Sequence, residues 1–489
     1  METKNFRHLL FLTAAGGIIT TGCEKNKIEH LNIILIFCDD MGYGDLSSFG
    51  AIGYQTPTLD SLAATGMKFT NFYCAQAVSS ASRAGLLTGC YPNRIGILGA
   101  LFPYSRHGIH PDEKTIAEML KEQGYTTGII GKWHLGHLPP FLPLQNGFDE
   151  YFGLPYSNDM WPYDYDGTPL SDTSSDPGKA RKAKFPPLQL IEGNTPTKEI
   201  KSLDDQATLT TLYTEKAVDF ILRHKNKPFF LYLAHSMPHT PIAVSEKFKG
   251  KSQQGLYGDV MMEIDWSVQQ ITNTLRKCGM AENTLIIFTS DNGPWLNFGN
   301  CAGSTAGLRE GKGTSFEGGQ RVPCFMHWPR VIPPGTVCNK LASTIDIFPT
   351  LAEITGGKLP GHKIDGVSLL PLLKGDFSVS PRKELWYYYD NNLEAVRNEA
   401  WKLVLPHPYR TYAGFAPGKD NLPGPTGKDS TQMALYDMRR DPGERYNVID
   451  EYPEIAEELL QMATRAREEL GDQLTGKKGS RTRACGRVE

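Results

Sequence analysis

The chain has 489 residues, a length that corresponds to about three domains of ordinary size. Its 51 lysines and arginines nearly balance its 54 aspartates and glutamates, so the formal net charge is only −3. Because no long basic run is present, nothing indicates nucleic-acid binding, and any affinity for an anion must arise from a local cluster of charge.

The first 23 residues have the pattern of an export signal. Lys4, Arg7 and His8 precede an apolar run, Leu9 to Thr21, that is too short to span a bilayer. The run ends at Thr21-Gly22-Cys23, which resembles a bacterial lipobox with Cys23 as the lipidated residue. We therefore expect a periplasmic or cell-surface lipoprotein of a Gram-negative bacterium, in contact with the membrane only through a lipid anchor. A plain cleaved signal and a buried N-terminal helix are the alternatives.

Strand and helix patterns alternate through the next 300 residues. Continuous apolar runs predict strands, amphipathic runs predict helices, and the segment Ser171 to Lys198 has the composition of a long insert or flexible loop. This alternation predicts an α/β fold with a large, mixed, mostly parallel sheet and helices on both faces. In such sheets the site lies beyond the carboxyl ends of the strands. The expected strands are 32–38, 67–74, 125–130, 229–234, 284–288 and 322–327, and the expected helices are 56–64, 115–123 and 205–225.

Acidic residues follow two of the predicted strands directly. Asp39 and Asp40 come after the first, and two carboxylates about 4 Å apart repel by about 4 kcal/mol at an effective dielectric constant near 20. Asp291 and Asn292 repeat the arrangement after the strand 284–288. Each motif alone could be a solvated turn. Together, three carboxylates and an amide oxygen are hard ligands that suit calcium.

The stretch from Ser79 to Gly89 combines small residues, Arg83 and an apolar pair, as in a loop that enters a helix closed by glycine. The N-terminus of a helix is an anion site, although a simple serine-capped helix explains the same composition.

Four more polar residues lie in short loops after strands or between glycines. Lys132 and His134 fall within 131–136, and Lys312 lies in the glycine-rich segment 311–319. After the strand 229–234, either His235 or His239 is the functional histidine and the other is structural. A surface lysine, a structural histidine and a solvated turn are the alternative interpretations of these residues.

The order of these blocks resembles the type I, formylglycine-dependent sulfatases of the alkaline phosphatase superfamily. Their signature, Cys/Ser-x-Pro/Ala-Ser-Arg followed by Leu-Thr-Gly, is matched by Ser79, Ala81, Ser82 and Arg83 in its serine-type version, with Ala81 in place of the commoner proline. The Gly-Lys-Trp-His, His-x-Pro and Gly-Lys-Gly-Thr-x-x-Glu-Gly-Gly blocks are present as well. The arylsulfatase A-like and N-acetylgalactosamine-sulfatase-like branch is the most similar.

The resemblance implies that a maturase oxidises Ser79 to formylglycine, whose hydrate offers two hydroxyls: one attacks sulfur, and the second then expels sulfate. It implies one calcium ion, two lysines on the sulfate, Arg83 ordering the hydrate, His134 assisting collapse of the adduct, and His239 with Lys312 protonating the leaving alcohol. The metal ligands so implied are Asp39, Asp40, Ser79, Asp291 and Asn292; the catalytic residues are Ser79, Arg83, Lys132, His134, His239 and Lys312; the substrate-binding residues are Ser157, Asn158 and Asp159.

Two other regions bear on the substrate. The stretch Tyr151 to Asp166 mixes aromatic and acidic residues, which suits either sugar binding or core packing. After about residue 380 the pattern changes to strands 385–389, 393–405 with a turn near Arg397-Asn398, and 434–438, and a helix 451–470. We expect an export signal over 1–23, a catalytic domain over 24–380, and a smaller α+β subdomain with antiparallel strands over 381–489.

The sequence thus predicts a sulfatase that acts on the sulfate esters of a carbohydrate, a sulfated glycan or glycosaminoglycan-type saccharide. Its expected partners are the sulfated saccharide and the maturase. The alternatives are a phosphodiesterase or phosphonate-ester hydrolase of the same superfamily, and an exported glycan-binding protein whose Ser79 is never matured.

Overall fold

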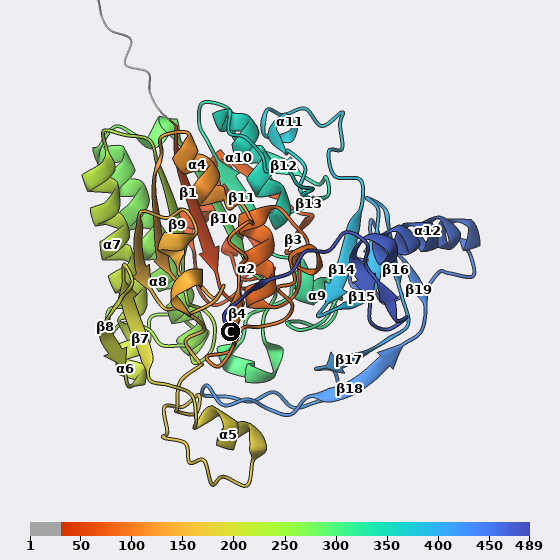
Figure 1. Ribbon diagram of the computed structural model, residues 1–489, viewed down its shortest axis with the longest axis horizontal. Coiled ribbons are helices and arrows are strands. Elements are labelled where there is room, and N and C mark those ends of the chain that lie inside the picture. The colour runs from red at the N-terminus through yellow and green to blue at the C-terminus, as the bar shows by residue number, and fades with distance from the viewer. Residues whose placement is uncertain (1–30) are drawn as a thin grey trace, which may run out of the picture.

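The computed structural model describes residues 31–489 (Figure 1). The predicted export signal and Cys23 lie outside the described residues. A ten-stranded sheet forms the centre, with strand order β12-β2-β11-β10-β1-β9-β5-β6-β7-β8. Its inner strands are parallel: β10 Thr284–Ser290, β1 Asn32–Cys38, β9 Phe229–Ala234, β5 Thr126–Gly131 and β6 Glu150–Gly153. The outer strands are β11 Cys324–His327, β2 Met67–Phe69, β12 Thr336–Cys338, β7 Leu188–Glu192 and β8 Thr195–Ile200.

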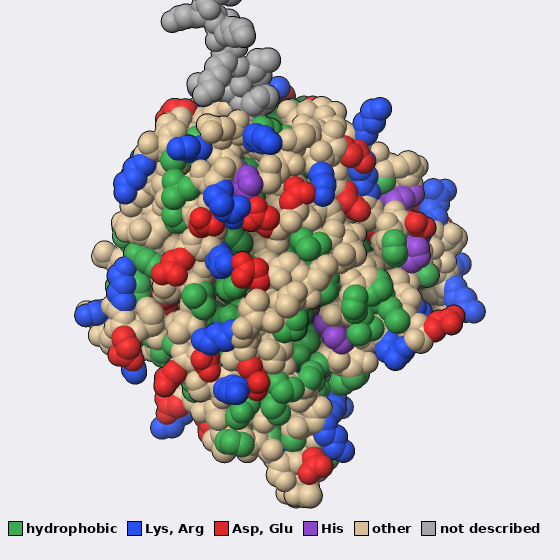
Figure 2. Space-filling model, turned by 60° about the vertical axis from the view of Figure 1, so that its left-hand side comes forward, with side chains coloured by type: hydrophobic (Ala, Val, Ile, Leu, Met, Phe, Trp, Pro, Cys, Tyr) green, Lys and Arg blue, Asp and Glu red, His purple; other side chains and the backbone are tan. Residues whose placement is uncertain are grey.

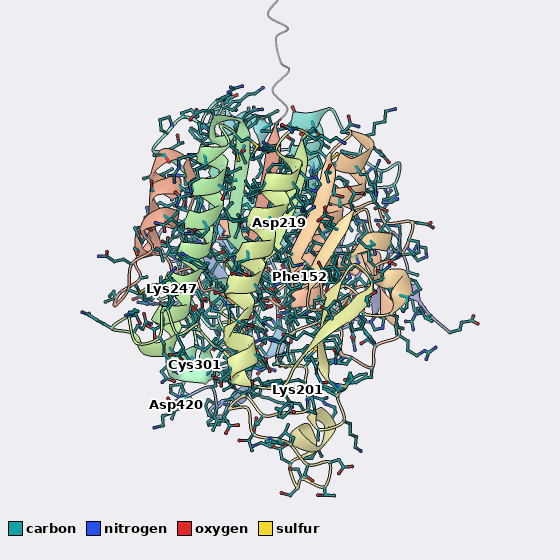
Figure 3. All side chains as sticks on the ribbon, turned by 90° about the vertical axis from the view of Figure 1, so that its left-hand side faces the viewer. Phe152, Lys201, Asp219, Lys247, Cys301 and Asp420 are labelled. Atoms are coloured by element: carbon teal, nitrogen blue, oxygen red, sulfur yellow. The ribbon has the colours of Figure 1, made fainter. Side chains whose placement is uncertain are left out.

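Helices cover both faces of this sheet, because the side chains of β1 alternate between the two faces and are apolar on both. Ile33, Leu35 and Phe37 point into one core, and Ile34 and Ile36 point into the other. The first core lies beneath α2 Ser79–Thr88, α4 Ile116–Glu122 and α10 Ile347–Thr355. The second lies beneath α1 Pro57–Thr65, α7 Leu209–His224 and α8 Gly255–Lys277. Figure 3 looks onto α7 and α8 on this second face.

A second, smaller sheet follows in the chain, with all neighbours antiparallel. Its strands are β14 Leu385–Tyr389, β15 Asn392–Arg397, β16 Trp401–Val404 and β19 Ala434–Asp437, and α12 Pro453–Leu470 packs on it. A separate hairpin, β17 His407–Thr411 and β18 Gly427–Thr431, leaves this sheet and reaches along the lower side of the molecule (Figure 1). The predicted fold class, a mixed α/β sheet with a smaller α+β part, is confirmed.

The remaining elements are short. They are α3 Pro92–Ile95, α5 Pro177–Lys182, α6 Leu203–Ala207, α9 Glu317–Gln320 and α11 Leu370–Leu373, with the strands β3 Phe72–Tyr73, β4 His107–Gly108, β13 Ala342–Ser343, β20 Gly471–Asp472, β21 Lys477–Lys478 and β22 Gly486–Arg487. Over residues 31–489, no helix has both the length and the apolar character needed to cross a membrane.

Three expectations about elements were wrong. The segment 171–198 is not one loop, because it contains α5, all of β7 and most of β8. Those strands lie at the sheet edge, and the exposed polar residues of β8 lack the apolar pattern of a buried strand. The expected strand 67–74 is interrupted between β2 and β3, and the expected helix 205–225 divides at Thr208 into α6 and α7. The longest helix, α8, was not predicted.

Candidate active site

The predicted site residues meet at the carboxyl ends of the central parallel strands. Asp39 and Asp40 follow β1, Asp291 and Asn292 follow β10, and Lys132 follows β5. All five side chains are buried. Asp40 adopts a left-handed backbone conformation with φ 58°, which turns the chain sharply at the end of β1. The carboxylates of Asp39 and Asp40 therefore both lie at the edge of the sheet where the parallel strands end.

Hydrogen bonds join the acidic residues to one another. The backbone N–H of Asp40 donates to Asp291 Oδ1 at 3.1 Å, and Asn292 Nδ2 donates to Asp40 Oδ1 at 2.7 Å. Ligand atoms of Asp39, Asp40 and His239 lie within 4.8 Å of one another. Within the described chain, Asn292 Oδ1 is buried and accepts no hydrogen bond. Buried carboxylates around an unsatisfied amide oxygen fit a hard cation such as a metal ion.

Ser79 is the first residue of α2, a helix that is buried along its whole length. Its Oγ donates to Asp39 Oδ1 at 3.1 Å and accepts from Lys132 Nζ at 3.2 Å. Because the first N–H groups of a helix have no intrahelical partner and the helix dipole is positive there, this end of α2 favours a negative charge. Gly89, at φ 68°, ends the helix, as the sequence predicts.

Arg83 lies one turn further along α2 and connects three parts of the site. Its Nη2 donates to Asp291 Oδ2 at 2.9 Å and lies 3.3 Å from Asp39 Oδ2, and its Nη1 donates to the carbonyl oxygen of Lys132 at 3.1 Å. The guanidinium is fully buried. It therefore fixes the position of α2, and of Ser79, against the ends of β1, β5 and β10.

Two lysines approach the cluster from opposite sides. Lys132 Nζ forms an ion pair with Asp39 and lies 3.3 Å from Ser157 Oγ. Lys312 Nζ donates to Asp40 Oδ2 at 2.8 Å and lies 4.4 Å from the centre of the Trp295 ring. Counting Arg83, three cationic groups balance three carboxylates. A divalent cation would give the site an excess of two positive charges, which attracts a monoanionic sulfate ester.

The hydrogen bonds of the two site histidines indicate their tautomers. His134 Nε2 lies 2.9 Å from the carbonyl oxygen of Leu101, so Nε2–H donates there and Nδ1 carries a lone pair. Burial, together with the positive charge of Lys132, holds the pKa of His134 well below its usual value. In His239 the roles are reversed, because Nδ1 lies 2.6 Å from the carbonyl oxygen of Thr240. Its Nε2 lies 3.6 Å from Asp40 Oδ2 and 3.5 Å from Ser157 Oγ.

His235 is buried away from this cluster. Its Nε2 lies 3.4 Å from Ser267 Oγ of α8, its ring is near Tyr213, and burial lowers its pKa to about 4. These neighbours belong to the core between α7 and α8. Of the two candidate histidines, His239 is the one that the fold brings to the acidic residues.

The three residues assigned to substrate binding differ in position. Ser157 faces Lys132 and His239, as above. Asn158 is fully buried, and its Nδ2 donates to Gln206 Oε1 at 2.9 Å and to the carbonyl oxygen of Pro241 at 3.1 Å. Those bonds hold the His239 loop, which is a positioning role. Asp159 Oδ2 accepts from Tyr165 at 3.3 Å, and Asp159 Oδ1 has no hydrogen-bond partner in the described chain.

Sequence reasoning missed Trp295, which forms one wall of the site. Its ring centre lies 5.7 Å from that of His239 and 6.1 Å from that of Tyr165. Trp295 comes directly after the Asp291 motif in the sequence, and this proximity was the signal that could have identified it as a site residue. Tyr165 falls in the stretch that was noted for its aromatic and acidic residues.

The fold and the site define a hydrolase of sulfuric esters. The family model "Sulfatase" matches residues 31–357, and the model "C-terminal region of aryl-sulfatase" matches 380–485. The chain belongs to the sulfatase family.

Individual relatives and a solved structure show in more detail what the chain is similar to. Arylsulfatase A of Bos taurus is 39% identical over 460 residues, covering 88% of this chain and 85% of the relative. N-acetylgalactosamine-6-sulfatase of Mus musculus is 38% identical and covers 93% and 89%. A solved Bacteroides thetaiotaomicron structure, connected with the metabolism of multiple glycosaminoglycans, has a TM-score of 0.74 at 31% identity and covers 90% and 99%.

Proposed function

We propose that this sulfatase removes sulfate from a saccharide and that it uses formylglycine, made from Ser79, together with one calcium ion. The observation that carries the proposal is the position of Ser79 Oγ, within hydrogen-bond distance of both Asp39 and Lys132. The amino acid to be oxidised is thus in contact with a proposed metal ligand and with a cation for the sulfate.

Asp39, Asp40, Asp291 and Asn292 would hold the calcium ion together with residue 79. When bound, the ion would supply positive charge for the sulfate oxygens, and the formylglycine hydrate would supply the attacking hydroxyl. Asn292 Oδ1, buried without a partner in the described chain, supports this ligand set. Oxygen ligands alone favour calcium or magnesium over a softer metal.

The remaining residues act on the sulfate and on protons. Lys132 and Lys312 bind the sulfate oxygens and stabilise the charge that develops on them. His134 accepts a proton from a hydroxyl of residue 79 at Nδ1, because its Nε2–H is committed to Leu101. In its imidazolium form, His239 passes the proton on Nε2 to the leaving oxygen and becomes the neutral Nδ1–H tautomer, because its Nδ1–H stays committed to Thr240.

A carbohydrate ester is the substrate class that the relatives favour. One is named for N-acetylgalactosamine 6-sulfate, and a solved structure is connected with glycosaminoglycan metabolism. The exported, lipid-anchored location predicted from residues 1–23 agrees with a polymer-derived substrate outside the cytoplasm. We retain it as part of this proposal, together with maturation by a formylglycine-generating enzyme.

The test is product release by protein co-expressed with a serine-type maturase. Sulfated saccharides and their phosphate analogues are offered in parallel, and free sulfate and free phosphate are measured. We expect sulfate release from at least one saccharide and little phosphate release. Ser79→Ala, which cannot be oxidised to formylglycine, is the matched control and should lose nearly all activity. Release of 4-nitrophenol from bis(4-nitrophenyl) phosphate or a 4-nitrophenyl phosphonate, in preference to sulfate release, would instead support the phosphodiester or phosphonate-ester alternative.

A further inference from the structure

Two segments lie at the same lower side of the molecule, beneath the carboxyl ends of the sheet strands. One is the excursion that carries α5, and the other is the β17–β18 hairpin with its connecting loop (Figure 1). Figure 3, turned by 90°, again shows α5 projecting below the sheet, beyond the labelled residues Lys201 and Cys301. The connecting loop reaches the His239 segment, because Asn421 accepts from Ile242 N at 2.8 Å. These two segments border the mouth of the site.

The α5 segment carries an ammonium group without an acceptor. Lys182 Nζ is buried and has no hydrogen-bond partner among residues 31–489. It lies 3.6 Å from the centre of the Tyr165 ring. The nearby carboxylate of Asp164 is already paired with Lys179 at 2.6 Å. Burial lowers the pKa of Lys182, which is the expected response of a cation held away from water without a partner.

The hairpin carries a second cation without an acidic partner. Arg410 of β17, an exposed residue, forms no ion pair with any carboxylate in the described part of the chain. It forms a hydrogen bond with the hydroxyl of Tyr412, and the hydroxyls of Tyr389 and Tyr165 are near enough to interact with its charge. A Cβ placed on Gly313 would lie 3.6 Å from Arg410 Nη1. Arg410 therefore stands beside the loop that holds Lys312.

Tyr165 links both cations to the catalytic residues. Besides its contact with Lys182, its ring packs against Trp295, which in turn lies beside His239 and under Lys312. Its hydroxyl group donates to Asp159, whose Oδ1 is free to accept from a sugar hydroxyl. A saccharide whose sulfate contacts Lys132 and Lys312 would extend outward along this aromatic wall, toward Lys182 and Arg410.

We propose that Lys182 and Arg410 form a subsite for a second anionic group of the saccharide, one that is not hydrolysed. The inference rests on the proposed sulfatase function and deepens it, because it assigns the substrate to the doubly charged saccharides. The second group is a carboxylate or another sulfate, either of which offers several acceptor oxygens to the ammonium and the guanidinium.

Charge favours an anion over a neutral sugar at this place. Three carboxylates, Asp159, Asp164 and Asp166, attract Lys182, but Asp164 is paired with Lys179, and none of the three accepts a hydrogen bond from Lys182 Nζ in the described chain. The oxygens of an anion would supply the acceptor that the ammonium lacks, and they form stronger, charge-assisted hydrogen bonds than the hydroxyls of a neutral sugar do.

The experiment compares wild type with Lys182→Ala and Arg410→Ala, and both inhibitor binding and catalysis are measured for each protein. Inhibition of 4-nitrophenyl sulfate hydrolysis is measured for N-acetylgalactosamine 6-sulfate, its 4,6-disulfate, and the glucuronate-containing disaccharide of the 6-sulfate. Wild type should bind at least one doubly anionic sugar about 10- to 100-fold more tightly than the monosulfate. Each alanine variant should lose most of that preference and keep 4-nitrophenyl sulfate hydrolysis within about twofold. Whichever doubly anionic sugar is preferred identifies the group as sulfate or carboxylate.

Matched controls come from the same segments. Lys184, an exposed neighbour of Lys182, and Lys428, the register partner of Arg410 on β18, are changed to alanine and should leave the preference intact. Lys182→Arg, which keeps the charge, should retain most of it. An unchanged preference in both alanine variants would overturn the subsite, as would equal binding of all three sugars by wild type.

Failure of the sulfatase proposal would look different. If mature wild type released no sulfate from any ester, calorimetry on the unmatured Ser79 protein would still test the subsite. Tighter binding of a doubly anionic sugar, lost in Lys182→Ala, would support it, and equally weak binding of all the sugars would reject it.

Discussion

At the scale of single residues, the site depends on a few side chains whose partners are fixed by burial. Ser79 contacts Asp39 and Lys132, and each histidine commits one ring nitrogen to a backbone carbonyl. The other ring nitrogen of each histidine therefore remains available to exchange a proton. The consequences can be tested residue by residue.

The first prediction concerns maturation of Ser79. Oxidation of serine to formylglycine removes two hydrogens, so the tryptic peptide containing residue 79 should be lighter by about 2 Da in protein from a host with a serine-type maturase. Protein made without the maturase should keep serine and be nearly inactive. Peptide mass spectrometry paired with a sulfate-release assay measures both. Full activity with an unmodified serine would rule out the formylglycine mechanism.

The second prediction separates the two histidines. His239→Ala should lose about 10²–10⁴-fold in kcat on a sugar sulfate, because an alkoxide leaves poorly without a proton. A nitrophenyl sulfate, whose phenolate leaves without much protonation, should suffer less. His235→Ala should chiefly lower stability, since His235 packs between α7 and α8. Equal losses on both substrates for His239→Ala would argue for sulfate binding alone.

At the scale of elements, the smaller sheet is attached to the glycine-rich segment 311–319 by buried charges. Lys402 of β16 donates to the carbonyl oxygen of Ser315 at 2.8 Å, and it pairs with Glu317 at 3.1 Å and Glu444 at 2.8 Å. Because removing one partner of a buried pair is costly, this network holds the loop that carries Lys312 against β16.

A neighbouring pair predicts a pH dependence of stability. Glu394 of β15 lies 3.4 Å from His407 Nε2, and burial raises the pKa of Glu394 to about 8. The folded chain therefore keeps a proton that the unfolded chain releases above about pH 4.5, so the free energy of unfolding falls as pH rises toward 8. His407, whose pKa is lowered to about 4, is neutral in the folded state between pH 6.5 and 8, whereas about half of it is protonated in the unfolded chain at pH 6.5. Its deprotonation in the unfolded chain restores only about 0.4 kcal/mol over this range, against a loss of about 2 kcal/mol from Glu394.

Glu394→Gln, which stays neutral, should remove that part of the loss. Denaturant unfolding of wild type and variant at pH 6.5 and pH 8 measures it, and Glu457→Gln, at an exposed glutamate of α12, is the control. Parallel slopes for wild type and Glu394→Gln would show that the carboxyl is ionised in the folded state throughout this range.

At the scale of the whole molecule, the proposed metal site joins segments that are far apart in the chain, because Asp39 and Asp40 follow β1 and Asp291 and Asn292 follow its neighbour in the sheet, β10. Its three carboxylates are balanced by Arg83, Lys132 and Lys312, so the protein should fold without metal. Figure 2 shows acidic and basic side chains intermingled on the face that it draws, without a large patch of one sign there.

Removing metal should therefore lower the melting temperature and the activity without unfolding the chain. At 100-fold excess over its dissociation constant, bound calcium adds about 2.7 kcal/mol to the free energy of unfolding. Thermal melts with EGTA, then with added calcium or magnesium, measure this, and Asp291→Asn should respond much less than wild type. A melting temperature indifferent to EGTA and calcium, with full activity, would contradict the site.

The sequence by itself determined the sheet, its approximate strand ends and the segments that carry the charged groups. Buried parallel strands are continuous apolar runs, and side chains at their carboxyl ends have a common location whatever the loops do. The family followed from the order of the motifs. Edge strands such as β8 escaped detection, because an exposed strand does not need an apolar pattern.

Only the tertiary structure decided which distant residues meet. Lys312 reaches Asp40 across 272 positions of sequence, and His239 rather than His235 faces the acidic cluster because the chain turns after β9. Lys182 and Arg410 look like ordinary surface residues in the sequence. Within residues 31–489 neither forms an ion pair, and this is a property of three-dimensional neighbours, since the nearby carboxylate of Asp164 is paired with Lys179 and Lys182 Nζ has no hydrogen-bond partner there.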